Sequence, residues 1–286
     1  MTLGRTLVSG LLFALAAPVP WAAAEDALPV YLQDRGEGVT TSLFGTYVRG
    51  GELLVYPFYE FYSFSDEPYS GEDLEISDDE EEYSGRLRAH EAILFFAYGI
   101  TDDLAIELES KLYEKASLKR ASNDMTSGLT DKFSESQSFG ALQAQLRWRV
   151  LRETENRPEV YTWVEIDHPL KKEKVLVGSA DWEGAIGIGF VKGFRWGTIT
   201  PRASLGYSKE DDKWGAGEWA VEYLKRVSDH WRLVATVEGE ADKEISLIGE
   251  VQYSIAPRAV LKLNSGFGVH GPAPDFAPEV GIIFSF

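Results

Sequence analysis

The chain has 286 residues, no cysteine and a formal net charge of −18 at pH 7. The lack of cysteine excludes a disulfide framework and cysteine-ligated metals, and the strong negative charge argues against a nucleic-acid partner. Beyond the N-terminus no segment approaches ~20 consecutive apolar residues, which excludes a helical membrane protein.

Residues 1–24 have the features of a secretory signal peptide. Arg5 supplies the positive charge, Leu7–Ala17 is apolar, and alanines occupy positions 22–24 before two acidic residues. A membrane anchor is the alternative, but the apolar run is short and is followed by two prolines. We therefore predict cleavage and export.

The segment 25–51 lacks any long alternation of apolar and polar residues. Asp34–Gly38 is rich in turn-forming residues, and Thr41–Tyr47 fits either a short helix or a strand. We predict a periplasmic N-terminal segment that tucks into the mouth of the barrel described next. A flexible leader is the alternative.

From Glu52 onward the chain repeats runs in which apolar and polar residues alternate, as they do on the two faces of a β-strand. The runs are Glu52–Phe64, Ser84–Gly99, Leu104–Glu114, Ser138–Leu151, Glu159–Asp167, Trp182–Phe190, Ile199–Tyr207, Glu218–Val227, Trp231–Glu240, Ile245–Ile255, Arg258–Gly268 and Asp275–Phe286. The second run has four consecutive apolar residues at 93–96, for which a bulge near His90-Glu91 would account.

Short and long connections alternate between these runs. The long ones follow the first three odd-numbered runs, at Ser65–Tyr83, Lys115–Gln137 and Pro169–Asp181. This alternation is typical of short periplasmic turns and longer outer loops. A soluble sandwich is the alternative, but its core could not hold so many unpaired glutamates. We predict an all-β, antiparallel, up-and-down transmembrane barrel of about twelve strands over residues 52–286. Its predicted location is the outer membrane of a Gram-negative bacterium, with membrane lipid and lipopolysaccharide as partners.

The last run ends the chain on an aromatic residue. Its apolar row, predicted to face lipid, consists of Phe276, Val280, Ile282, Phe284 and Phe286. Pro278 lacks a backbone N–H, so it requires a bulge or a gap in the pairing near the outer rim.

Several of these features resemble known proteins. The signal peptide, the two-residue repeat and the terminal Phe286 resemble bacterial outer-membrane β-barrel proteins, and the last strand resembles the signal recognised by the barrel-assembly machinery. Two motifs resemble outer-membrane transporters grouped with the phenol meta-degradation pathway. They are Tyr98-Gly99-Ile100-Thr101-Asp102-Asp103-Leu104-Ala105-Ile106 and Gly266-Phe267-Gly268 followed by Asp275-Phe276-Ala277-Pro278-Glu279-Val280-Gly281. The resemblance implies a barrel that acts as a transporter, with the assembly machinery as a partner.

The polar rows of the strands supply the candidate site. The charged residues predicted to line the lumen are Glu107, Glu109, Lys111, Arg147, Arg149, Glu165, Asp167, Arg202, Glu218, Glu222, Arg232, Glu238, Glu250, Lys262 and Glu279. Because carboxylates attract cations, we predict a passive transporter or channel for small solutes, either cation-preferring or specific for hydrophobic substrates. The alternative is a structural or surface-interaction barrel, whose lumen is closed by ion pairs between neighbouring strands.

No catalytic, cofactor or metal site is predicted. The acidic loop 65–83 fits a solvated loop better than a calcium site, since its spacing is not that of an EF-hand. A lipid hydrolase would need a serine and a histidine; His168 follows Glu165 and Asp167, and His90 precedes Glu91, so either histidine could belong to such a site. No Gly-x-Ser-x-Gly or His-Glu-x-x-His motif accompanies them.

Overall fold

The computed structural model describes residues 28–171, 174–178, 181–209, 212–240 and 244–286, so the predicted signal peptide lies outside the described residues. No helix within these ranges is long and apolar enough to span a lipid bilayer. The main sheet contains twelve long strands. They are β3 (Leu53–Tyr69), β4 (Tyr83–Thr101), β5 (Leu104–Lys119), β7 (Ala141–Leu151), β8 (Glu159–Pro169), β9 (Glu183–Phe194), β10 (Gly197–Ser208), β11 (Lys213–Arg226), β12 (Trp231–Gly239), β13 (Ile245–Ala256), β14 (Ala259–His270) and β15 (Ala277–Ser285).

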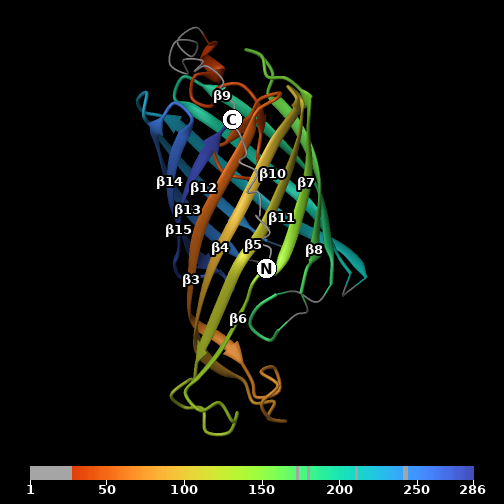
Figure 1. Cartoon of the computed structure of the whole chain (residues 1–286), viewed down its shortest axis with the longest axis vertical. Coiled ribbons are helices and arrows are strands. Elements are labelled where there is room, and N and C mark those ends of the chain that lie inside the picture. The colour runs from red at the N-terminus through yellow and green to blue at the C-terminus, as the bar shows by residue number, and fades with distance from the viewer. Residues whose placement is uncertain (1–27, 172–173, 179–180, 210–211, 241–243) are drawn as a thin grey trace, which may run out of the picture.

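These strands form a closed antiparallel barrel (Figure 1). Each strand pairs with its neighbours in sequence, and β15 pairs with β3 to close the ring. The β15–β3 pairing is interrupted between Phe276, which bridges Ser63, and Glu279, which pairs with Glu60. Pro278 lies in this gap, as its missing N–H requires. The predicted twelve-strand antiparallel barrel is confirmed.

The two faces of the wall differ in chemistry. Val164 and Leu263 point outward and are 52% and 46% exposed, whereas their neighbours Trp163 and Lys262 point inward and are buried. In the last strand the row from Phe276 to Phe286 also points outward, while Ile283 points into the barrel. Such a continuous apolar belt suits contact with lipid and would be unfavourable in water. The barrel therefore spans a membrane.

The two ends of the barrel also differ. At one end, called the short-turn end, strands are joined by turns such as 102–103, 195–196 and 257–258. The other, long-loop end carries the connections 70–82, 120–131 and 170–182. Because outer-membrane barrels have short periplasmic turns and longer outer loops, the short-turn end faces the periplasm.

Strands β3, β4 and β5 contain 17, 19 and 16 residues and extend beyond the barrel at the long-loop end (Figure 1). About half of the predicted loop Lys115–Gln137 is instead strand, because β5 continues to Lys119 and β6 (Lys132–Gln137) returns along it. Likewise β3 continues to Tyr69. Polar residues form strands here because a small separate core, with Tyr69, Leu74 and Leu118 in it, supports them. The predicted strand start at Ser138 is also displaced, to Ala141, since Phe139 has a left-handed φ of 58°.

The predicted bulge at His90-Glu91 is wrong. Pairing of β4 with β3 is continuous through these residues, and the register shift lies in the adjacent β5, where Leu112 is the extra residue. The alternation in β4 is intact, with Ile93 and Phe95 buried inside the barrel. Consecutive apolar residues occur because both faces of the wall are apolar here, one toward lipid and one toward the N-terminal segment.

That N-terminal segment occupies the lumen at the short-turn end. It contains a 3₁₀ turn η1 (Val30–Leu32) and a two-strand hairpin of β1 (Val39–Thr40) and β2 (Tyr47–Val48). Val39 and Val48 are fully buried in a core that includes Leu54 and Phe95 of the wall. Residues 34–49 are called the plug below. The predicted helix or strand at 41–47 is instead mainly the turn that joins the two short strands.

Candidate functional site

Buried ion pairs hold the base of the plug. Arg35 Nη2 lies 2.9 Å from Glu159 Oε2 and 3.2 Å from Glu153 Oε2, and all three side chains are buried. Arg149 Nη1 lies 3.3 Å from the same Glu159 oxygen. Burial alone would lower the pKa of Arg35, but the neighbouring charges, Glu159 foremost, raise it above its ordinary value. The guanidinium therefore stays charged and anchors the plug to β8 and to the turn that precedes it.

The tip of the plug is bound by residues from distant strands. The backbone N–H and Oγ of Ser42 donate to Glu107 at 3.1 and 2.6 Å. The N–H of Gly45 donates to Glu222 at 3.1 Å. A Cβ at position 45 would approach within 2.8 Å of Gln252 and Val234, so only glycine fits. The tip thus closes the middle of the lumen.

Wall cations bind the plug's backbone and aromatic groups. Lys262 Nζ donates to the carbonyl of Phe44 at 3.2 Å, and Arg202 lies 4.9 Å from the centre of the Phe44 ring. Arg147 and Arg149 donate to the carbonyls of Thr40 and Gly38 at 3.2 and 2.6 Å. These predicted lumen residues contact the plug instead of an open passage. The sequence did not predict their partners in the plug, because isolated residues such as Arg35 and Ser42 belong to no periodic pattern.

A cavity of about 590 Å³ lies on the long-loop side of the plug, against β7 to β12. Its charged lining consists of Glu165, Asp167, Glu183, Glu218, Glu240 and Lys213. Trp163 forms an aromatic wall, and a Cβ on Gly187 would lie only 2.1 Å from its ring, so the glycine is needed for this close approach. We call this cavity the acidic vestibule. Its carboxylates create a negative potential in the outer half of the lumen.

A row of glutamates continues this negative surface across β15, β3, β4 and β5. Glu279, Glu60, Glu91 and Glu114 are successive Cα partners, so like charges lie directly opposite one another. Lys111 Nζ lies 2.8 Å from Glu91 and 3.8 Å from Glu114. The other predicted residues of this half also face the lumen. They are Glu109, Glu165, Asp167, Glu218 and Glu238.

Part of the predicted row is paired between strands. Arg147 pairs with Glu107 at 3.3 Å, Arg202 with Glu218 at 2.5 Å, and Lys262 with Glu250 at 3.2 Å. Arg147–Glu107 and Lys262–Glu250 lie in the short-turn half, so the predicted alternative, a lumen closed by such pairs, is supported there, whereas Glu218 lines the vestibule. Closure there nevertheless involves the plug as well as the pairs.

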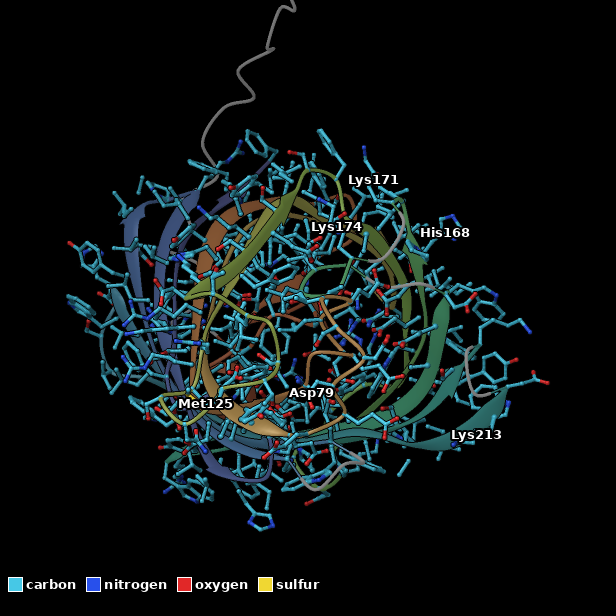
Figure 2. All side chains as sticks on the ribbon, turned by 90° about the horizontal axis from the view of Figure 1, so that it is seen from below. Asp79, Met125, His168, Lys171, Lys174 and Lys213 are labelled. Carbon is cyan, nitrogen blue, oxygen red and sulfur yellow. The ribbon has the colours of Figure 1, made fainter. Side chains whose placement is uncertain are left out.

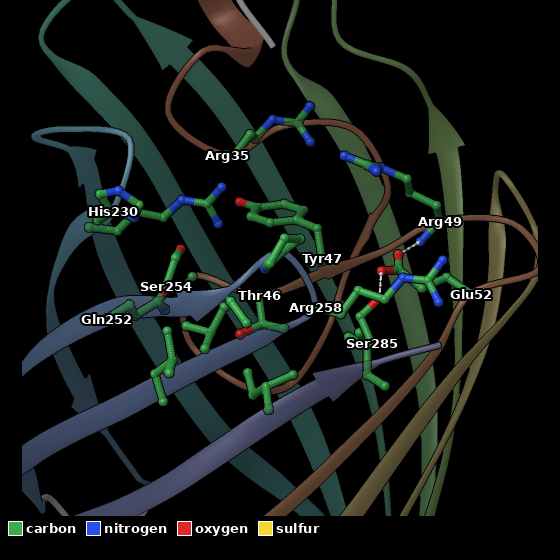
Figure 3. A pocket seen from close by; sticks show the side chains of 18 of the residues that line it. Arg35, Thr46, Tyr47, Arg49, Glu52, His230, Gln252, Ser254, Arg258 and Ser285 are labelled. Atoms are coloured by element: carbon green, nitrogen blue, oxygen red, sulfur yellow. Dashed lines mark hydrogen bonds between the residues drawn. The ribbon is translucent and has the colours of Figure 1, made fainter. Parts of the chain in front are cut away.

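Two further cavities border Arg35 of the plug at the short-turn end, and a third lies beside Asp34 and Lys225. The larger, about 370 Å³, is lined by apolar residues such as Leu54 and Ile283 and by Arg49, Arg232 and Arg258 (Figure 3). The smaller, about 260 Å³, lies by β7 and β8 and includes Arg149 and Arg152. Arg35 lines both cavities. The lumen thus has space on both sides of the plug tip.

The outer loops are fixed by specific hydrogen bonds. Tyr69 donates to Asp124 at 2.7 Å, Thr126 to Asp79 at 2.7 Å, and Ser77 to the carbonyl of Ser127 at 2.8 Å. These bonds join the acidic loop 70–82 to the loop 120–131. Figure 2 shows Asp79 in front of the barrel opening in the view from the long-loop end. In the part of the chain that the structure describes, no cluster of three or more potential metal ligands is present.

The candidate hydrolase residues do not form a site. His90 points outward and its Nδ1 lies 2.5 Å from the hydroxyl of Tyr59, while His168 is exposed on β8. Among the described residues neither histidine is hydrogen-bonded to a serine.

No protein-family model matches the chain, and no curated protein matches its sequence. Among solved structures, the COG4313 outer membrane channel from Pseudomonas putida F1 superposes with a TM-score of 0.58 at 14% identity, covering 83% of this chain and 96% of that one. The KdgM porin (TM-score 0.49, 7% identity, 82% and 99% covered) and the outer membrane phospholipase A of Escherichia coli (0.44, 9%, 80% and 92%) are more distant. The first likeness shows the fold of an outer-membrane barrel. Together with the lipid-facing belt, this fold places the chain in the outer membrane of a Gram-negative bacterium.

Proposed function

We propose that the chain is a passive outer-membrane channel for small solutes, gated by its own plug. The observation that supports this proposal is the arrangement of cavities along the lumen. The acidic vestibule opens toward the long loops, three cavities lie at the periplasmic end, and the plug tip, hydrogen-bonded to Glu107 and Glu222, separates them. A wall filled solely for rigidity would need no such spaces.

The vestibule also bears on the class of solute. Its carboxylates and the glutamate row attract cations and repel anions in a narrow, weakly screened lumen. We propose a preference for small cations and for solutes that carry a cationic group. The resemblance of two motifs to transporters grouped with phenol meta-degradation supports a different candidate, a small aromatic solute, for which Trp163 offers a contact surface.

The competing proposal is a structural or surface-interaction barrel. It is favoured by the interstrand ion pairs and by the fixed outer loops, which cover part of the opening. The two proposals differ in one measurable property, the passage of ions or solutes.

Single-channel conductance in planar bilayers tests the proposal. We compare the wild-type chain with a variant lacking the plug, residues 34–49, and with Glu37→Gln, at an exposed plug residue, as the control. The proposal expects a small cation-selective conductance in the wild type and a several-fold larger one without the plug. If all three proteins insert as heat-modifiable barrels and none conducts, the chain is a closed structural barrel.

A further inference from the structure

The outward face of the extended strands carries a group of unpaired cations. Arg86 in β4, Lys119 in β5 and Lys132 in β6 are direct Cα partners across three neighbouring strands. Arg88 and Lys115 lie on the same face, nearer to the barrel. All five side chains are exposed. We call these five residues the basic face.

The alternation of the strands shows that the basic face points away from the barrel axis. Ala116 and Leu118, which alternate with the lysines of β5, are 2% and 1% exposed and face inward. Arg86 and Arg88 likewise alternate with the inward-facing Gly85 and Leu87. The cations therefore face whatever surrounds the barrel at this height.

No ion pair in the described part of the chain neutralises these charges. Among its ion pairs within 4 Å, none includes a residue of the basic face. Like charges directly opposite one another in a sheet destabilise it. Three aligned cations in a chain with a net charge of −18 therefore indicate that an external anion balances them.

The height of the basic face relative to the membrane identifies the kind of anion. Directly below it lie Tyr59, Phe61 and Tyr113, outward-facing aromatic residues of the kind that mark the membrane interface. Lys115 comes two residues after Tyr113, and Lys119 four residues after Lys115, so the basic face extends over roughly 13 Å of strand, or about 10 Å of height at a strand tilt of about 40°. A phospholipid headgroup layer is only about 5–7 Å deep. The vertical spread therefore suits a larger headgroup with phosphates at more than one height.

We propose that the basic face binds the phosphate groups of lipopolysaccharide, the anionic glycolipid of the outer leaflet. Arg86, Lys119 and Lys132 bind the upper anionic group, and Arg88 with Lys115 binds the lower one. Arginine binds phosphate through two parallel N–H donors and lysine as a point charge. This site is separate from the lumen, so it does not depend on the proposed channel function.

Binding of purified lipid A by the full-length barrel in neutral detergent tests the site. The variant R86Q/K119Q/K132Q is compared with R157Q/R195Q/R258Q, which removes three exposed cations from the short-turn end. Each surface cation near a charged membrane contributes about fivefold in affinity, so the first variant is expected to bind on the order of a hundredfold more weakly. The control variant is expected to bind as the wild type does.

Three further measurements make the outcome decisive. Heat-modifiable mobility confirms that each variant is folded, and R86K/R88K, which keeps the charge, is expected to retain most of the binding. Dephosphorylated lipid A is expected to bind no better to the wild type than to R86Q/K119Q/K132Q. Equal binding of lipid A by the wild type and R86Q/K119Q/K132Q would overturn the proposal. So would equal wild-type affinity for lipid A and phosphatidylglycerol, because the face would then recognise any anionic lipid.

Discussion

The two halves of the lumen use charged residues in opposite ways. In the short-turn half, carboxylates and guanidinium groups are matched and buried, as in Arg35 with Glu153 and Glu159. In the long-loop half, carboxylates outnumber cations and border open space. Charged residues in a barrel interior therefore have no single meaning. Where another segment of the chain fills the lumen, the charged residues bind that segment. Where the lumen is open, they set the local electrostatic potential.

The largest effect is expected from breaking the matched half. Arg35→Met removes the cation that Glu153 and Glu159 share and leaves them only Lys192 and Arg149, so plug docking should weaken by up to about 3–5 kcal/mol. Limited proteolysis of the plug should then become rapid, and channel conductance should rise. Glu37→Gln, at an exposed position of the same segment, is the control. A protected plug in Arg35→Met would show that its apolar contacts suffice.

Loosening the tip should have a smaller effect. Ser42→Ala removes the Oγ hydrogen bond to Glu107, and hydrogen bonds to charged groups contribute about 1.5–3 kcal/mol. We expect more frequent openings in single-channel recordings with an unchanged barrel melting temperature. Ser134→Ala, on the exposed face of β6, serves as the control. Identical opening frequencies in the two variants would place the gate elsewhere.

Neutralising the vestibule should change selectivity and leave stability intact. In Glu165→Gln/Asp167→Asn/Glu183→Gln the reversal potential in a salt gradient should shift toward that of a non-selective pore, since the local negative potential is reduced. The matched control removes three carboxylates from the outer loop, Glu80→Gln/Glu81→Gln/Glu82→Gln. Should the control shift the reversal potential equally, the selectivity would arise from the loops.

The smallest expected effect concerns acid stability at the short-turn rim. Arg152 donates to Asp103 at 2.7 and 2.8 Å and, with help from Arg149, holds the pKa of that carboxyl below its usual range. Because the pKa of Asp103 is lower in the folded protein, its carboxylate stabilises the fold at pH values above the ordinary Asp pKa of about 4. This stabilisation is lost as the pH falls through the pKa of the folded protein. The pair is partly exposed, so it contributes less than about 1 kcal/mol. Asp103→Asn should therefore narrow the difference between denaturant midpoints at pH 7 and pH 3.

The strands were predictable because each residue of a barrel wall faces one of two distinct environments. In β7, Leu142 and Leu146 alternate with Gln143 and Arg147 for this reason, and the pattern is readable without any tertiary information. The prediction failed where a third environment is present. The inner wall of β4 is apolar because it packs on the plug, and β6 is a polar strand supported by a small core outside the membrane.

The structure of the plug could not be predicted from a sequence pattern in the same way. Its contacts join residues more than 100 positions apart, such as Arg35 with Glu159, and each one looks like an ordinary loop residue in isolation. The glutamate row was similarly visible only as single members. The register of β15, β3, β4 and β5 is what sets Glu279, Glu60, Glu91 and Glu114 side by side.

By itself the sequence determined the barrel, its twelve strands and the outward row from Phe276 to Phe286, because a two-residue period follows from backbone geometry alone. It also predicted a set of charged residues for the lumen. Only the tertiary structure decided which of them hold the plug and which border open space. That division depends on how closely groups from distant segments approach, and the energy of a buried charge changes sharply with its nearest partner.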